Sequence, residues 1–172
     1  MDIKQPGKDN IVLIGMPGVG KSTVGVILAK MLGLQFIDAD LLIQQQEGKL
    51  LREIIEQSGV DGFIQVENRV NASIEAKGAI IATGGSVVYG EEAMRHLKSI
   101  GLLLYLYVPY GLLEKRLSDI RGRGVVLREG QSLLDLYRER TPLYEQYADL
   151  CVSEEGLSVE GTVERIIEKL NF

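Results

Sequence analysis

The sequence contains one cysteine, Cys151, and one histidine, His96, among its 172 residues. A single cysteine cannot close an intramolecular disulfide, and without a second thiol or a partner histidine there is no zinc-binding pattern. The protein is therefore expected in a reducing compartment. Because Cys151 lies in an apolar segment, its side chain is predicted to be a small buried hydrophobe.

Long hydrophobic runs and an excess of basic charge are also missing. The longest uncharged stretch, residues 99–113, is interrupted by two glycines and a proline, and it falls short of the roughly 20 apolar residues of a membrane-spanning helix. The polar first ten residues do not read as a secretory signal. With 19 Lys and Arg against 24 Asp and Glu the formal charge is −5, which disfavours broad binding to nucleic acids or anionic membranes. We expect a cytoplasmic protein with neither kind of partner.

The composition and hydrophobic pattern indicate one α/β domain over residues 1–172. Hydrophobic residues make up 45% and charged residues 25% of the chain, as in globular proteins. Apolar runs alternate with helical patterns, which predicts a parallel sheet of five strands. The predicted strands are residues 11–14, 35–37, 79–82, 102–108 and 150–152, and the predicted helices are residues 21–31, 50–56, 62–76, 91–98, 110–118, 133–147 and 159–170.

A phosphate-binding motif follows the first predicted strand. Residues 15–23 read GMPGVGKST and match G-x-x-x-x-G-K-[ST] at every fixed position. Backbone N–H groups of such a loop surround a phosphate, the lysine contacts the β and γ oxygens, and the next hydroxyl binds Mg²⁺. A dinucleotide-binding loop is excluded because Thr23 stands where its last glycine would be. The predicted nucleotide site comprises Gly15, Gly18, Val19, Gly20, Lys21, Ser22 and Thr23, with Ser22 as a metal ligand.

Two further motifs come after the second and third predicted strands, at the edge of the sheet where ligands bind. If the chain stays extended, Asp38 and Asp40 lie on one side, where one carboxylate would hold Mg²⁺ through water and the other would accept a proton. The alternative is that Asp40 caps a helix beginning at Leu41. Gly84 and Gly85 would let backbone N–H groups approach a small ligand, although a turn needing positive φ explains them equally well.

Together with an arginine-rich segment after the fourth strand, these motifs resemble the shikimate kinase family over nearly the whole chain. The resemblance implies a three-layer P-loop kinase fold, often monomeric, that transfers the γ-phosphoryl of ATP to the 3-hydroxyl of shikimate with Mg²⁺. It implies that Asp38 lies near the metal, that Asp40 binds the acceptor hydroxyl, that Gly84 and Gly85 line the acceptor site, and that Arg140 holds the acceptor carboxylate.

The resemblance also implies a lid at about residues 116–130. Its two arginines, seven positions apart in the family, match Arg116 near adenine and Arg123 over the phosphates, so Lys21, Asp40 and Arg123 are the expected catalytic residues. Residues 115–140 carry a net charge of +3 within an acidic chain, which independently favours an anion site there.

The sequence departs from the family at one acceptor position. The family has Phe-Arg-x-x-Glu early in the helix after strand two, with its arginine on the acceptor carboxylate, whereas this chain has Ile64 at the arginine position. Two alternatives therefore stay open: a kinase for another small hydroxylated metabolite, and a nucleotide-binding regulator that has lost turnover. The presence of Asp40 and Arg123 argues against the regulator, which would need no acceptor base.

Overall fold

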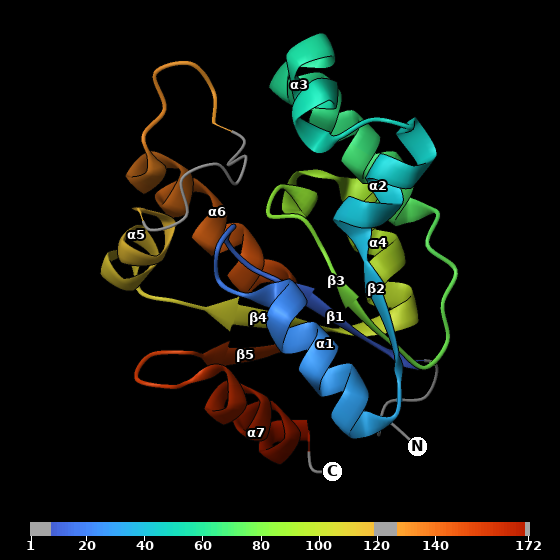
Figure 1. Cartoon of the computed structure of the whole chain (residues 1–172), viewed down its shortest axis with the longest axis vertical. Helices are drawn as coiled ribbons and strands as arrows, with labels where there is room; N and C mark the ends of the chain where they lie inside the picture. Colours follow the sequence, from blue (N-terminus) through green and yellow to red (C-terminus); the bar gives the residue numbers. More distant parts are fainter. Residues whose placement is uncertain (1–7, 119–126, 171–172) are drawn as a thin grey trace.

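Uninterrupted apolar runs form the central strands of a five-stranded parallel sheet in the computed structural model, which describes residues 8–118 and 127–170 (Figure 1). The strand order is β2-β3-β1-β4-β5, and each neighbouring pair is parallel. The strands are β1 (Asn10–Ile14), β2 (Gln35–Asp38), β3 (Ala79–Ala82), β4 (Gly101–Tyr107) and β5 (Leu150–Ser153). The prediction of a five-stranded parallel sheet is confirmed.

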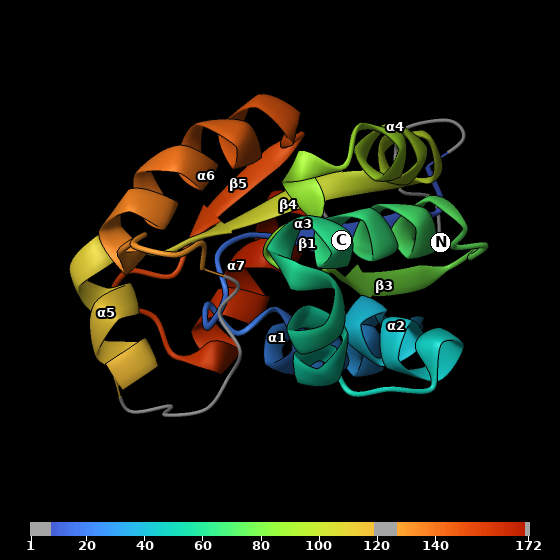
Figure 2. The same ribbon diagram turned by 90° about the horizontal axis from the view of Figure 1, so that it is seen from above.

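Helices cover both faces of the sheet and complete a three-layer architecture. Viewed along the sheet, α1 and α7 lie on one side, and α4 and α6 lie on the other (Figure 2). The helices are α1 (Lys21–Leu32), α2 (Ala39–Glu47), α3 (Leu51–Ala72), α4 (Glu91–Ile100), α5 (Tyr110–Ser118), α6 (Leu133–Tyr147) and α7 (Val159–Leu170), with a short 3-10 helix at Val87–Tyr89. Among the described residues, no helix is long and apolar enough to cross a membrane.

Two local predictions are wrong, and a third is confirmed with a shorter end. The two helical segments predicted at residues 50–56 and 62–76 are the two parts of α3, which the non-helical backbone of Gly59, with a φ of 69°, separates. The second part ends at Ala72. Helix α2 was absent from the predicted set. Cys151 is exposed rather than buried, because successive side chains of β5 point to opposite faces of the sheet and it is Val152 that points into the core.

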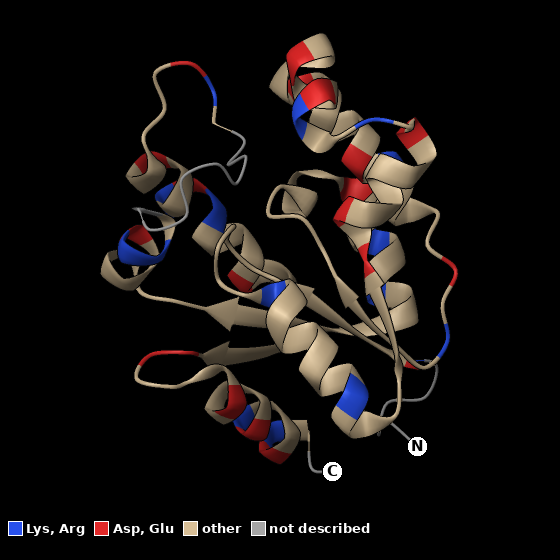
Figure 3. Cartoon of the chain, in the orientation of Figure 1, with Lys and Arg blue, Asp and Glu red and all other residues tan. Residues whose placement is uncertain are grey.

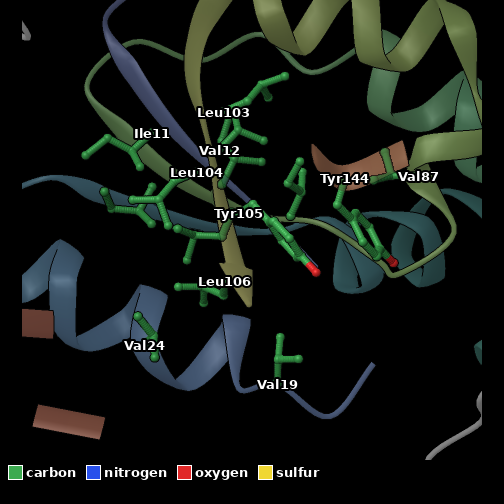
Figure 4. Packing of buried hydrophobic residues seen from close by; sticks show 14 of the residues in the cluster. Ile11, Val12, Val19, Val24, Val87, Leu103, Leu104, Tyr105, Leu106 and Tyr144 are labelled. Atoms are coloured by element: carbon green, nitrogen blue, oxygen red, sulfur yellow. The ribbon is translucent and has the colours of Figure 1, made fainter. Parts of the chain in front are cut away.

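The hydrophobic core packs around β1, β3 and β4, the three strands buried along almost their whole length. Figure 4 shows the rings of Tyr105 from β4 and Tyr144 from α6 side by side; their centroids are 5.2 Å apart in a stacked arrangement. The hydroxyl and the N–H of Thr83 donate to the carbonyl of Leu13 at 2.9 and 3.2 Å. This contact fixes the chain leaving β3 beside the end of β1, so the motifs that follow these strands meet at one edge.

Candidate active site

The loop between β1 and α1 folds around the ammonium group of Lys21. Gly15, Gly18 and Gly20 all have positive φ, and a Cβ on Gly15 would lie 2.7 Å from the Leu106 carbonyl oxygen, so this tight path requires glycine. The Lys21 ammonium donates to the carbonyl oxygens of Gly15 and Met16 at 2.7 and 2.9 Å. Burial lowers the pKa of Lys21 to about 8. The cation is therefore held inside the loop where nucleotide phosphates would bind.

Asp38 joins the phosphate loop to helix α2. Its Oδ2 accepts a hydrogen bond from the Ser22 hydroxyl at 2.7 Å, and its Oδ1 accepts from the N–H groups of Asp40 at 3.0 Å and Leu41 at 3.4 Å. Asp38 is thus the N-cap of α2. The alternative cap role for Asp40 is wrong, and so is the extended path between the two aspartates, because Asp40 lies in the first helical turn.

The Ser22 and Asp38 side chains fit a magnesium ion, which prefers oxygen ligands and commonly shares them with substrate phosphates. In the described ranges 8–118 and 127–170, no group of three or more His, Cys, Asp or Glu side chains is placed to hold a metal by itself. A metal at this position would therefore take part of its coordination from the nucleotide and water.

Asp40 and its neighbours line a cavity of about 420 Å³ at the carboxyl edge of the sheet. Burial, and secondarily the nearby Asp38 carboxylate, raises the pKa of Asp40, while Lys21 opposes this effect. A carboxylate with a raised pKa is a better proton acceptor at neutral pH. The cavity gathers predicted residues from four segments of the chain: Gly18, Gly20, Lys21, Ser22, Thr23, Asp38, Asp40, Gly84, Gly85 and Arg140.

Close packing, not backbone conformation, explains the double glycine. Neither Gly84 nor Gly85 has positive φ, so the turn alternative does not apply. A Cβ on Gly84 would lie 2.1 Å from Glu67 Oε1 and 3.0 Å from Asp40 Oδ1, and one on Gly85 would lie 3.1 Å from Arg140 Nη1. The missing side chains therefore allow two carboxylates and a guanidinium to converge on this loop.

Glu67 is a site residue for which the sequence predicted no role. It lies on α3, is 1% exposed, and its Oε2 accepts a short hydrogen bond from the Ser86 hydroxyl. Burial raises the pKa of Glu67 to about 7, and the Asp40 carboxylate adds to the shift. Acidic residues predominate on α2 and α3, which contribute Asp40 and Glu67 to this side of the cavity (Figure 3).

A second cavity of about 370 Å³ lies on the other side of the phosphate loop. Val19, Arg116 and Glu154 line it. The Arg116 guanidinium donates to Glu154 Oε2 at 2.5 Å and to the Val19 carbonyl at 3.2 Å. Burial raises the pKa of Glu154, and the ion pair with Arg116 opposes that shift. Glu154 follows β5 directly, so the rule that sites form at the carboxyl ends of strands would have singled it out.

Residues 119–126 of the lid expected at 116–130, including the predicted catalytic Arg123, lie outside the described residues. All the other predicted site residues line one of the two cavities, apart from Gly15, whose carbonyl accepts from Lys21.

The fold and the site define a P-loop phosphotransferase: a phosphate loop after β1, an adjacent hydroxyl and carboxylate, and an acceptor cavity containing a second carboxylate and an arginine. The family model for shikimate kinase matches residues 17–171. The chain belongs to the shikimate kinase family, whose members are kinases that use ATP to phosphorylate an alcohol group.

Individual relatives agree with this membership. The shikimate kinase of Thermodesulfovibrio yellowstonii is 37% identical over 93% of this chain and 94% of its own length, and that of Persephonella marina is 32% identical over 94% and 98%. A solved shikimate kinase from Acinetobacter baumannii, in complex with shikimate, superposes with a TM-score of 0.85 at 31% identity, covering 95% of this chain and 93% of that one. A Janibacter sugar kinase, at 16% identity and a TM-score of 0.59, shares the fold alone.

Proposed function

We propose that this protein is an ATP-dependent shikimate kinase that transfers the γ-phosphoryl of Mg²⁺-bound ATP to the 3-hydroxyl of shikimate. The observation that carries the proposal is the convergence of Lys21, Asp40 and Arg140 on one cavity of about 420 Å³. These groups supply a phosphate-binding cation, a proton acceptor and a carboxylate-binding cation. The solved relative that contains shikimate supports this choice of acceptor.

In the proposed reaction the acceptor oxygen forms a bond to the γ-phosphorus while the bond to the β–γ bridging oxygen breaks, and ADP leaves. Asp40 takes the hydroxyl proton, for which its raised pKa suits it. Lys21 stabilises the charge on the transferring group, and Ser22 and Asp38 hold the metal. Bound Mg²⁺ supplies further neutralisation of the phosphates. Arg123 is proposed to close over them from a lid at 116–130, and Arg116 to lie against the adenine.

We propose that the active unit is a monomer with one kinase domain over residues 1–172. We place the enzyme in the cytoplasm, where ATP is available, with small molecules rather than nucleic acids or membranes as its partners.

A second candidate function is a kinase of the same fold for another small hydroxylated acceptor. Ile64, at the position where the family has a carboxylate-binding arginine, favours this candidate. One charge-assisted hydrogen bond contributes about 1.5–3 kcal/mol, so its loss would weaken binding of a carboxylate acceptor by roughly 10- to 150-fold unless another cation compensates. A nucleotide-binding regulator without turnover is the remaining alternative.

The test is ADP formation with Mg²⁺ and ATP in the presence and absence of shikimate, beside a panel of other hydroxylated acceptors. Asp40→Asn should abolish shikimate-dependent turnover and leave ATP binding intact. Asp9→Asn is the matched control, because Asp9 is an exposed carboxylate paired with Lys77, remote from the cavity. Turnover on another acceptor alone would select the second candidate, and nucleotide binding without any turnover would select the regulator.

A further inference from the structure

Tyr89 holds Arg140 by two different contacts. The Arg140 guanidinium carbon lies 5.1 Å from the centre of the Tyr89 ring, within the range of a cation–π interaction. Arg140 Nε also donates a hydrogen bond to the Tyr89 hydroxyl at 3.2 Å. The Tyr89 ring and the Tyr89 hydroxyl therefore both hold the guanidinium.

Glu139 determines which hydrogen bond the Tyr89 hydroxyl donates and which one it accepts. The hydroxyl donates its proton to Glu139 Oε1 at 2.6 Å, so its oxygen lone pairs are available to accept from Arg140. Burial and the hydrogen bond to Glu139 raise the pKa of Tyr89, which keeps this proton in place. Glu139 is in turn bound by Gln131, whose amide donates to Oε2 at 2.8 Å.

Tyr89 binds the edge of the Arg140 guanidinium that carries Nε, and a different edge lies at the cavity wall. Nε donates to Tyr89, whereas Nη1 lies 3.1 Å from where a Cβ of Gly85 would be. Arg140 is 2% exposed, so protein contacts hold its guanidinium, those to Tyr89 among them. A guanidinium presented by its two Nη groups forms parallel hydrogen bonds with a carboxylate, provided that its plane is fixed.

The path of the chain places Tyr89 for this contact. The segment that leaves β3 contributes Gly84 and Gly85 to the cavity and then turns through the 3-10 helix Val87–Tyr89. The Tyr144 hydroxyl donates to the Gly85 carbonyl at 2.5 Å, and this bond ties the same segment to α6, the helix that carries Arg140. One loop therefore both opens space for the acceptor and orients its cation.

We propose that Tyr89 is a positioning residue that orients Arg140 end-on toward the carboxylate of the acceptor and so sets selectivity for anionic acceptors. This inference rests on the proposed function, in which Arg140 binds that carboxylate. This chain has Ile64 where the family has another carboxylate-binding arginine. Binding of the acceptor carboxylate therefore depends more strongly on the orientation of Arg140.

The test compares Tyr89→Phe and Tyr89→Leu with the unmodified enzyme on shikimate and on its neutral methyl ester. Tyr89→Phe removes the hydroxyl and keeps the ring, and it should raise the KM for shikimate about tenfold. Tyr89→Leu also removes the cation–π contact, and it should raise the KM for shikimate by a further threefold or more. The KM for ATP should stay within about twofold, and the preference for shikimate over the ester should fall by the same factor as shikimate binding.

Two further variants make the result interpretable. Tyr110→Phe is the matched control: its hydroxyl also donates to a glutamate, Glu114 at 2.8 Å, but on the exposed surface of α5, and it should leave both KM values unchanged. Arg140→Lys keeps the positive charge but loses the planar guanidinium that can donate two parallel hydrogen bonds. It should weaken shikimate binding at least as much as Tyr89→Leu. Thermal unfolding of each variant establishes that it is folded.

Each outcome separates the inference from the function on which it rests. A higher KM for shikimate and reduced ester discrimination in both Tyr89 variants support the inference. An effect of Arg140→Lys with none in the Tyr89 variants overturns the inference and leaves the proposed function standing. No effect of Arg140→Lys removes the proposed role of Arg140 itself. Equal increases in the KM values for shikimate, the ester and ATP would make Tyr89 a general structural residue and overturn the inference.

Discussion

The Arg116 guanidinium lies 2.5 Å from the carboxylate of Glu154, although 38 residues separate the two in sequence. Arg116 also donates to the Val19 carbonyl in the phosphate loop. Glu154 is 3% exposed, so its carboxylate is a largely desolvated partner that holds the arginine beside the cavity behind that loop.

Replacing Glu154 by alanine should raise the KM for ATP about tenfold, because Arg116 loses the group that holds it beside the second cavity, where it is proposed to lie against the adenine. The KM for the acceptor should stay unchanged, since Glu154 does not line the acceptor cavity. Steady-state kinetics with each substrate varied in turn measure both values. Glu154→Gln, which keeps a hydrogen-bond acceptor, should recover part of the loss. Equal KM values for ATP in all three proteins would contradict the positioning of Arg116 by Glu154.

Glu67 should make stability depend on pH. Its pKa rises from 4.5 to about 7 in the folded protein. Between these values the unfolded chain releases the proton while the folded chain keeps it, so this group lowers the free energy of unfolding as pH rises. The effect is absent below pH 4.5 and complete above pH 7. A shift of this size corresponds to about 3 kcal/mol.

Glu67→Gln should therefore gain stability relative to the unmodified protein as pH increases from 4.5 to above 7. Urea unfolding at several pH values measures the difference in the free energy of unfolding between the two proteins. The contributions of the other titrating groups largely cancel in this difference, because both proteins contain them. A difference that stays constant across the range would show that Glu67 titrates normally.

Gly84→Ala should lower kcat/KM by about a hundredfold or more, because the added Cβ would displace the Glu67 and Asp40 carboxylates. Displacing a general base by a fraction of an ångström is costly in catalysis. Gly111→Ala in α5 is the matched control, since a Cβ there meets no atom within 4 Å. Activity and the midpoint of thermal unfolding should be measured for both. Full activity of Gly84→Ala would show that the two carboxylates need not converge on this loop.

Ser22→Ala should raise the Mg²⁺ concentration needed for half-maximal activity by about tenfold, since it removes one of the oxygen atoms proposed to bind the metal. Titration of activity with Mg²⁺ at a fixed ATP concentration gives this value. Ser73→Ala serves as the comparison, because that hydroxyl donates to the Val70 carbonyl at the end of α3 and lies outside the cavity lining. An unchanged magnesium requirement in Ser22→Ala would exclude Ser22 as a ligand.

The sequence by itself determined the phosphate-binding loop of this protein. A strand followed by a glycine-rich loop, lysine and hydroxyl leaves little freedom, because the contacts of the lysine are local: Lys21 donates to carbonyls only five and six positions away. The parallel sheet was equally predictable, since its central strands are continuous apolar runs.

Only the tertiary structure decided which residues hold Arg140 at the acceptor cavity and Arg116 at the second cavity. The partners of Arg140 and Arg116 lie 51 and 38 residues away in the chain, and no periodicity or motif encodes such pairs. Gly84 gave no indication that it makes room for Glu67 and Asp40. The pKa shifts of both carboxylates are likewise tertiary effects, because burial causes them and burial is set by how α2 and α3 pack against the loop after β3.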